Sequence, residues 1–111
     1  MTDLSAKRCV PCEGGTKPLN SEQCAVFSVQ VPEWRIGEDG LSISRNFRFN
    51  DFKEAIAFVN EVADIAEFEG HHPDMLVYGY RNVKVTLSTH AIKGLSENDF
   101  IVAAKIDQIG K

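Results

Sequence analysis

Residues 51–73 read "DFKEAIAFVNEVADIAEFEGHHP" and contain the longest regular pattern in this chain of 111 residues. Apolar residues recur there at intervals of three and four, which is the spacing of one face of an α-helix. They are Phe52, Ala55, Ile56, Val59, Ala63 and Ala66. Asp51 is a suitable N-cap, and Gly70 followed by Pro73 marks the end, because glycine readily adopts the left-handed conformation and proline cannot continue a helix. We therefore predict a helix over residues 51–69.

Strand patterns flank this helix on both sides. Residues 34–49, "WRIGEDGLSISRNFRF", alternate apolar and polar side chains around the turn residues "EDG", which predicts a β-hairpin. Residues 75–80, "MLVYGY", and 81–90, "RNVKVTLSTH", predict a second pair of strands. In the last of these, Val83, Val85 and Leu87 alternate with Lys84, Thr86, Ser88 and His90. No helical pattern separates the strands of either pair, so we expect antiparallel pairing.

Two shorter helices complete the set. Residues 21–29 predict a helix with Ser21 as its N-cap. Residues 96–109 predict a last helix that begins with the S-x-x-D cap of Ser96 and Asp99. This last helix carries apolar residues around more than one of its faces. One sheet cannot bury them all, so we expect a second surface, contributed by another subunit, to cover it.

The order of these elements is α-β-β-α-β-β-α. It predicts a single α+β domain, in which a four-stranded antiparallel sheet has about three helices packed on one face. We expect the domain to span residues 20–111. Residues 1–19 contain prolines and glycines without any periodicity, which predicts a loosely held N-terminal arm.

The composition narrows the class of protein. Apolar residues make up 43% of the chain and charged residues 25%, which is typical of a globular protein. The net charge of −4 disfavours non-specific binding to nucleic acid or to anionic membranes. No apolar run approaches the roughly 18 residues that a membrane span needs. The N-terminal residues lack the apolar stretch of a signal peptide, so we expect a cytoplasmic protein.

The three cysteines, Cys9, Cys12 and Cys24, are an odd number in a chain without an export signal, which argues against a disulfide framework. "CVPC" at residues 9–12 has the spacing of a metal-binding knuckle. Tetrahedral zinc needs four ligands, however, and a second pair with suitable spacing is missing. The role of Cys9 and Cys12 therefore stays open.

Three histidines are candidates for acid–base chemistry. His71 and His72 directly follow the predicted end of the long helix, and Glu67 lies one helical turn earlier. His90 ends the polar side of a strand that also carries Ser88. If these segments meet at one rim of the sheet, three imidazoles and a carboxylate converge there. Histidine ordinarily titrates near neutral pH, so a pair can hold one proton donor and one acceptor at once.

Simpler interpretations of the same residues exist. A single histidine after a helix is commonly a C-cap, and Glu67 could be an ordinary solvated side chain. Asp99 is explained by the capping box. A metal site of His71, His72, His90 and Glu67 is disfavoured, because consecutive residues seldom bind one ion comfortably.

The longer pattern resembles a known family. "E-x-x-x-H-H-P" ending at Pro73, an aromatic residue at Tyr78, then "LSTH" and "GLSENDF" resemble the signature of the pterin-4a-carbinolamine dehydratases, over about residues 34–109. The resemblance implies a hydro-lyase that dehydrates 4a-hydroxytetrahydropterin to quinonoid dihydropterin, and thereby recycles the pterin cofactor of aromatic amino acid hydroxylases. It also implies the fold predicted above, a homodimer or homotetramer, and a reaction without any metal or organic cofactor.

The resemblance also assigns residues. His71, His72 and His90 match the family's active-site histidines, and Glu67 matches the acidic position before the pair. The segments that border the pterin correspond to Gly70, His71, His72, Ser88, Thr89 and His90, with Asp99 and Pro73 as further candidates. The assignment of acid and base among the histidines stays open.

Two other functions are compatible with the resemblance. Members of the family also act as dimerisation partners of a homeodomain transcription factor, and related domains assist the assembly of other proteins. Such a binding module would use the last helix and would not need the histidines. A role in molybdopterin metabolism would use the same pocket as the dehydratase.

Overall fold

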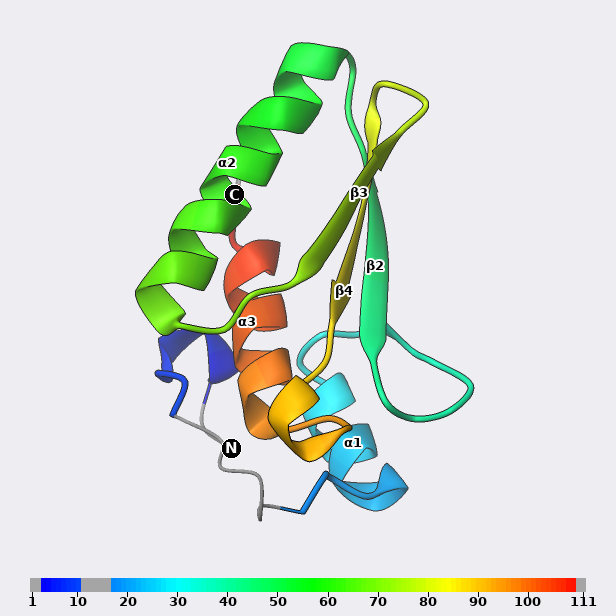
Figure 1. Ribbon diagram of the computed structural model, residues 1–111, viewed down its shortest axis with the longest axis vertical. Helices are drawn as coiled ribbons and strands as arrows, with labels where there is room; N and C mark the ends of the chain where they lie inside the picture. Colours follow the sequence, from blue (N-terminus) through cyan, green and yellow to red (C-terminus); the bar gives the residue numbers. More distant parts are fainter. Residues whose placement is uncertain (1–2, 11–16, 110–111) are drawn as a thin grey trace.

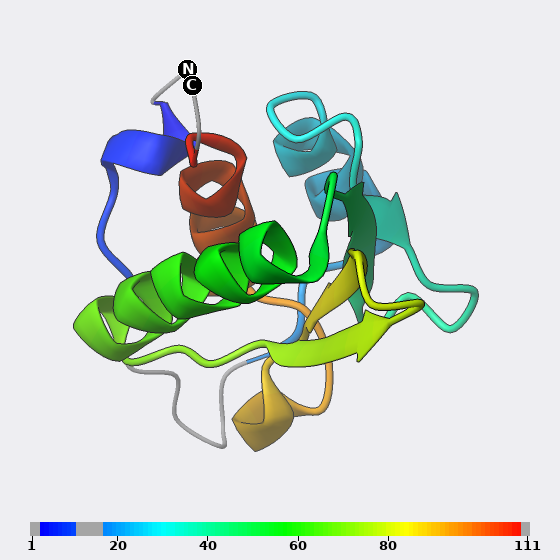
Figure 2. The same cartoon turned by 90° about the horizontal axis from the view of Figure 1, so that it is seen from above.

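The computed structural model describes residues 3–10 and 17–109. It contains one antiparallel sheet of four strands in the order β1-β2-β4-β3, with helices α2 and α3 on one of its faces (Figures 1 and 2). The strands are β1 (Arg35–Ile36), β2 (Ile43–Arg48), β3 (Asp74–Tyr78) and β4 (Asn82–Leu87). The helices are α1 (Ser21–Ser28), α2 (Phe52–Glu69) and α3 (Glu97–Asp107), with short 3₁₀ helices η1 (Leu4–Ala6) and η2 (His90–Ile92). The predicted α+β fold is confirmed.

The alternation in the strands decides which face of the sheet is buried. Val83, Val85 and Leu87 of β4 are fully buried against the helices, as predicted. In the β2–β4 register Ile43 lies opposite Leu87, so the two strands present their apolar side chains to the same face. β4 ends at Leu87, however, and the chain turns into η2 at His90. The prediction that His90 belongs to the polar face of a strand is therefore wrong.

Helix α2 ends at the predicted residue and begins one residue later than predicted, with Asp51 as its N-cap. The Asp51 side chain accepts a hydrogen bond from the Glu54 N–H at 2.8 Å, and Gly70 ends the helix with φ 65°. Its buried stripe differs in part from the predicted one and consists of Ala55, Phe58, Val62, Ala66 and Glu69. Phe58, which is absent from the predicted stripe, packs its ring against Phe47 of β2 and against Phe49 directly after β2, at centroid distances of 4.6 and 5.0 Å. Among the described residues, no helix is long and apolar enough to cross a membrane.

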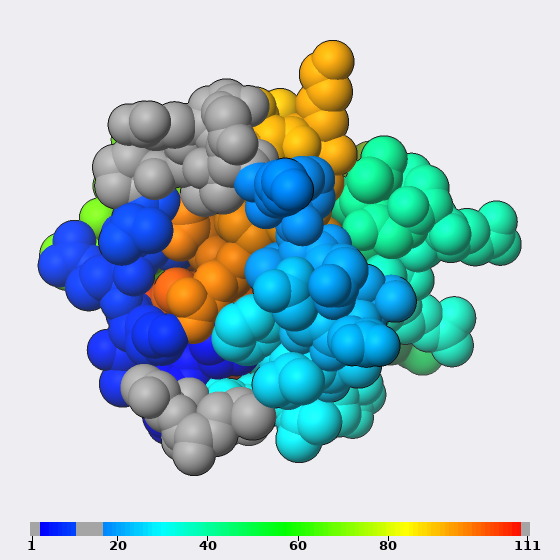
Figure 3. All heavy atoms as spheres, turned by 90° about the horizontal axis from the view of Figure 1, so that it is seen from below, coloured from blue at the N-terminus to red at the C-terminus, as the bar shows by residue number. Residues whose placement is uncertain are grey.

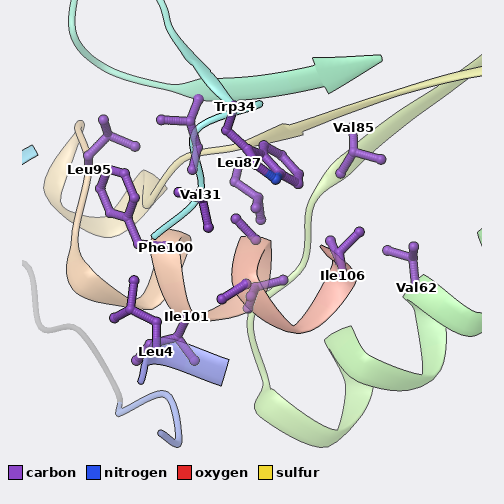
Figure 4. Close-up of a cluster of buried hydrophobic side chains, with 14 of the residues drawn as sticks. Leu4, Val31, Trp34, Val62, Val85, Leu87, Leu95, Phe100, Ile101 and Ile106 are labelled. Atoms are coloured by element: carbon purple, nitrogen blue, oxygen red, sulfur yellow. The ribbon is translucent and has the colours of Figure 1, made fainter. Parts of the chain in front are cut away.

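Helix α3 is the centre of the core. Residues 98–104 are all buried, and the second surface that this requires comes from the chain itself. Phe27 at the end of α1 stacks on Phe100 at 5.5 Å, and η1 places the fully buried Leu4 beside Ile101 (Figure 4). The apolar circumference of α3 thus needs no second subunit, contrary to expectation.

The described part of the N-terminal arm is packed against the domain. Figure 3 shows the segment before residue 11 and the segment that leads into α1 on either side of the start of α3. The predicted loose arm is therefore wrong for residues 3–10. The N-cap of α1 is Asn20 rather than Ser21, and its side chain accepts a hydrogen bond from the Gln23 N–H at 2.9 Å.

Candidate active site

The candidate site lies where the end of α2, the end of β4 and the start of α3 meet (Figure 1). Gly70 adopts the left-handed conformation, which a residue with a side chain adopts only with strain. The His71 N–H then donates a hydrogen bond back to the Ala66 carbonyl at 3.2 Å. Pro73 restricts His72 to an extended conformation. The two rings are thus presented on a fixed turn rather than on a regular element.

His71 is held by Asp99. Its Nε2 atom lies 2.6 Å from Oδ1 of Asp99, whose side chain is completely buried. The other carboxylate oxygen, Oδ2, accepts hydrogen bonds from the Thr89 hydroxyl at 2.8 Å and from the Ser96 N–H at 3.0 Å. An ionised carboxylate only accepts hydrogen bonds, so Nε2 of His71 carries the proton and Nδ1 is the nitrogen left for other groups.

Asp99 therefore has two roles at once. It forms the predicted capping box of α3 with Ser96, and it also orients an imidazole that lies 28 residues earlier in the chain. The Thr89 hydroxyl lies 2.8 Å from that of Ser96 and joins the same network. The capping interpretation of Asp99 is confirmed, but it describes only one of the two oxygens.

His72 has a different environment. Its Nε2 atom lies 2.6 Å from Oε2 of Glu67, and the two side chains are 61% and 78% exposed. Glu67 was predicted to converge with all three histidines. It contacts only His72, from the solvent side, and does not line the cavity. An exposed pair of this kind orients the ring but contributes little to the free energy of folding.

The three histidines line one cavity of about 510 Å³, a volume that suits a small organic ligand. Its walls comprise Cys9, Val10, Glu69, Gly70, His71, His72, Ser88, Thr89, His90, Ala91 and Asn98. The predicted convergence of Gly70, the histidines, Ser88 and Thr89 is thus seen in the structure. Glu67 and Pro73 are outside the walls, and Asp99 lies behind His71.

A larger cavity of about 850 Å³ lies between β2, the first half of α2 and the end of α3. Its walls carry the aromatic rings of Phe47, Phe49 and Phe58 and several carboxylates, but no histidine. It therefore lacks the side chain that exchanges protons most readily near neutral pH. We place the candidate site in the smaller cavity on chemical grounds.

Sequence reasoning missed five wall residues, Cys9, Val10, Glu69, Ala91 and Asn98. Glu69 is the clearest case, because its side chain is fully buried at the end of α2. Burial alone would raise the pKa of Glu69, but the Cys9 N–H, Lys105 and Arg8 together hold it below its ordinary value. Helical spacing from Val62 and Ala66 puts Glu69 on the buried stripe, so the period of α2 was a signal that could have found it.

Cys9 is unsuited to thiolate chemistry. Burial and the neighbouring Glu69 carboxylate raise the pKa of its thiol to about 12. The thiol is therefore protonated at neutral pH and is a poor nucleophile and a poor metal ligand. Within residues 3–10 and 17–109, no group of three His, Cys, Asp or Glu side chains could hold a metal ion. Cys12, the other half of the "CVPC" pattern, lies outside the described residues.

The site can be compared with known proteins. Residues 17–109 match the family described as "Pterin 4 alpha carbinolamine dehydratase". A relative from Halorhodospira halophila, named "Putative pterin-4-alpha-carbinolamine dehydratase", is 50% identical over 96% of this chain and 97% of its own length. "Pterin-4-alpha-carbinolamine dehydratase 2, mitochondrial" of Arabidopsis thaliana is 46% identical over 98% of this chain and 60% of its own length.

Two solved structures are also similar. A "transcriptional coactivator/pterin dehydratase" from Brucella melitensis has a TM-score of 0.79 and 30% identity, over 86% of this chain and all of the other. A pterin dehydratase-like protein described as a RuBisCO assembly factor in the alpha-carboxysome has a TM-score of 0.58 and 26% identity, over 68% of this chain and 86% of the other. Because the family match covers most of the chain and the relatives are similar over nearly its whole length, the chain belongs to the pterin 4 alpha carbinolamine dehydratase family.

Proposed function

We propose that this protein catalyses the dehydration of 4a-hydroxytetrahydropterin to quinonoid dihydropterin and water by histidine acid–base catalysis. The observation that supports this most directly is the His71–Asp99 contact at the wall of a cavity that His72 and His90 also line. Family membership agrees with it, since relatives are named as dehydratases of this class.

The chemistry needs two proton transfers. The C4a–O bond breaks as the 4a-hydroxyl receives a proton and leaves as water, and the N5–H proton is lost as the C4a=N5 double bond forms. One imidazole donates the first proton and another accepts the second, so the total number of protons on the enzyme is unchanged. The starting state returns when a proton passes from the second ring to the first through solvent. Proton transfers alone account for the reaction.

The geometry supports particular roles for the residues. His71 exchanges its proton at Nδ1, because Asp99 occupies Nε2 and fixes the ring and its tautomer. His72 supplies the second proton-transfer group, held from outside by Glu67. His90 is the first residue of η2 and lines the same cavity, where it contacts the substrate together with Ser88 and Thr89.

The physiological setting is part of the same proposal. The product is the oxidised form of a pterin cofactor, which a reductase must consume. We infer a role in recycling the pterin of aromatic amino acid hydroxylases, in the cytoplasm, by a homodimer or homotetramer.

The deciding experiment is a stopped-flow measurement of the decay of synthetic 4a-carbinolamine. We expect the protein to accelerate the decay at neutral pH, in proportion to its concentration. A decay no faster than in buffer would exclude the enzymatic function, whatever the protein binds.

A second candidate function is protein binding, because the two similar structures are described as a coactivator and as an assembly factor. The last helix cannot form that surface as expected, because α3 is buried by the rest of the chain. The sheet offers an alternative, since Leu76 and Tyr78 of the edge strand β3 are exposed apolar side chains. Affinity capture of a partner that survives replacement of all three histidines by alanine, from a protein without dehydratase activity, would favour this function over the first.

A further inference from the structure

Residues Arg8, Cys9 and Val10 form a short segment outside the helices and strands, here called the strap, of which Cys9 and Val10 line the histidine cavity. The Cys9 N–H donates a hydrogen bond to Oε1 of Glu69 at 2.8 Å. The Val10 N–H donates to Oδ1 of Asn98 at 3.0 Å, and the Asn98 amide donates to the Val10 carbonyl. Asn98 thus pairs with both polar backbone groups of Val10, as a neighbouring β-strand would.

The anchors of the strap are buried side chains. The Glu69 side chain is inaccessible to solvent, and Asn98 is buried at the start of α3. A buried carboxylate is costly unless it is paired and hydrogen-bonded. Lys105 Nζ lies 3.0 Å from Oε2 of Glu69, and Arg8 Nε lies 3.5 Å from Oε1. The Arg8 guanidinium also lies over the Phe68 ring, 4.1 Å from its centroid.

The anchors are adjacent to the proposed catalytic groups in the sequence. Glu69 precedes His71 by two residues, and Asn98 directly precedes Asp99. The strap is therefore fixed by the same ends of α2 and α3 that fix the His71–Asp99 pair. A displacement of the strap changes the cavity without changing the imidazole–carboxylate contact itself.

The strap is not explained by core packing alone. Leu4 of η1 covers α3, whereas the Val10 side chain is 65% exposed and has no place in the core. Cys9 and Val10 nevertheless line the cavity together with the three histidines. Cys9 also packs against the core, but two buried polar side chains, Glu69 and Asn98, hold the strap where it forms part of the cavity wall.

We propose that the strap is a wall of the substrate site, and that Glu69 and Asn98 are positioning residues that act through it. This inference rests on the proposed dehydratase function. A wall of this kind contacts bound substrate and transition state equally, so its loss weakens binding without slowing the chemical step.

The test replaces Val10 by proline, which removes the N–H donor to Asn98 and leaves every anchoring side chain in place. We expect Val10→Pro to raise KM for the carbinolamine about tenfold, with kcat within about twofold of the wild type. The dissociation constant of a dihydropterin, measured by calorimetry, should rise by the same factor. Glu69→Gln is a second variant with the same expected direction, because it weakens the anchor of Cys9.

Lys7→Ala is the matched control. Lys7 lies next to the strap and pairs with Glu97, but it does not line the cavity, so KM should stay at the wild-type value. An unchanged KM in folded Val10→Pro, or a fall in kcat without a change in KM, would overturn the inference. If Val10→Pro does not fold, Glu69→Gln decides by the same criteria. A wild-type protein without dehydratase activity would overturn both the proposed function and this inference. If the wild type is active but KM is unchanged in both variants, only this inference is overturned.

Discussion

Nε2 of His71 and Oδ1 of Asp99 lie 2.6 Å apart, although 28 residues separate them in the chain. The contact joins the turn after α2 to the first turn of α3. Because Asp99 is fully buried and also accepts hydrogen bonds from Thr89 and Ser96, the ring it holds has little freedom to rotate.

Asp99→Asn should lower kcat by on the order of 10²-fold or more, because an amide can donate to Nε2 and so favours the wrong tautomer of His71. The measurement is single-turnover decay of the carbinolamine. Glu97→Gln is the matched control, since Glu97 is the other acidic residue in the first turn of α3 and does not contact a histidine. A kcat within twofold of wild type in a folded Asp99→Asn protein would show that His71 does not need this partner.

His72 and Glu67 should respond very differently to substitution. His72→Ala removes a proton-transfer group and should lower kcat by on the order of 10²-fold. Glu67→Gln should lower it by no more than about fivefold, because an exposed ion pair orients the ring only weakly. Steady-state kinetics of both variants at neutral pH test the pair. An equal decrease of kcat in the two variants would mean that Glu67 takes part in the proton transfers themselves.

Leu4 tests whether the N-terminal segment is part of the folded domain. Leu4→Ala should lower the free energy of unfolding by about 2–5 kcal/mol, because it leaves a cavity against α3. Val29→Ala is the control, since Val29 is 74% exposed and its truncation should change stability by less than about 0.5 kcal/mol. Urea unfolding followed by circular dichroism measures both. A Leu4→Ala protein as stable as the control would mean that residues 3–10 are not anchored in solution.

Glu69 predicts a specific dependence of stability on pH. Its pKa in the folded protein lies below its ordinary value of 4.5, so the unfolded chain binds more protons as the pH falls through this range. The stabilisation by ionised Glu69 is therefore complete above pH 4.5 and is lost as the pH falls through the folded-state pKa. Wild type should exceed Glu69→Gln in stability at pH 7, and the gap should narrow below pH 4.5. A gap that stays constant down to pH 3 would contradict the assigned pKa direction.

Several features were predictable from the sequence because they depend on local chemistry. The span of α2 follows from its period, from the Asp51 cap and from Gly70 with Pro73. The faces of β2 and β4 follow from alternation, since successive side chains of a strand point to opposite sides. The placement of His71 and His72 just after a helix end is equally local, and their resemblance to a family motif pointed to the correct family.

The sequence by itself therefore determined the three α-helices, the four strands and their antiparallel pairing, and the position of His71 and His72 after a helix end. Only the tertiary structure decided which side chains form hydrogen bonds with one another across the fold. Asp99 reads as a cap in the sequence, and its second oxygen meets His71 only because α3 packs across the end of α2. Glu69 and Leu4 are buried for the same reason, since long-range packing decides which side chains lose contact with water and which polar groups must then find partners in the protein.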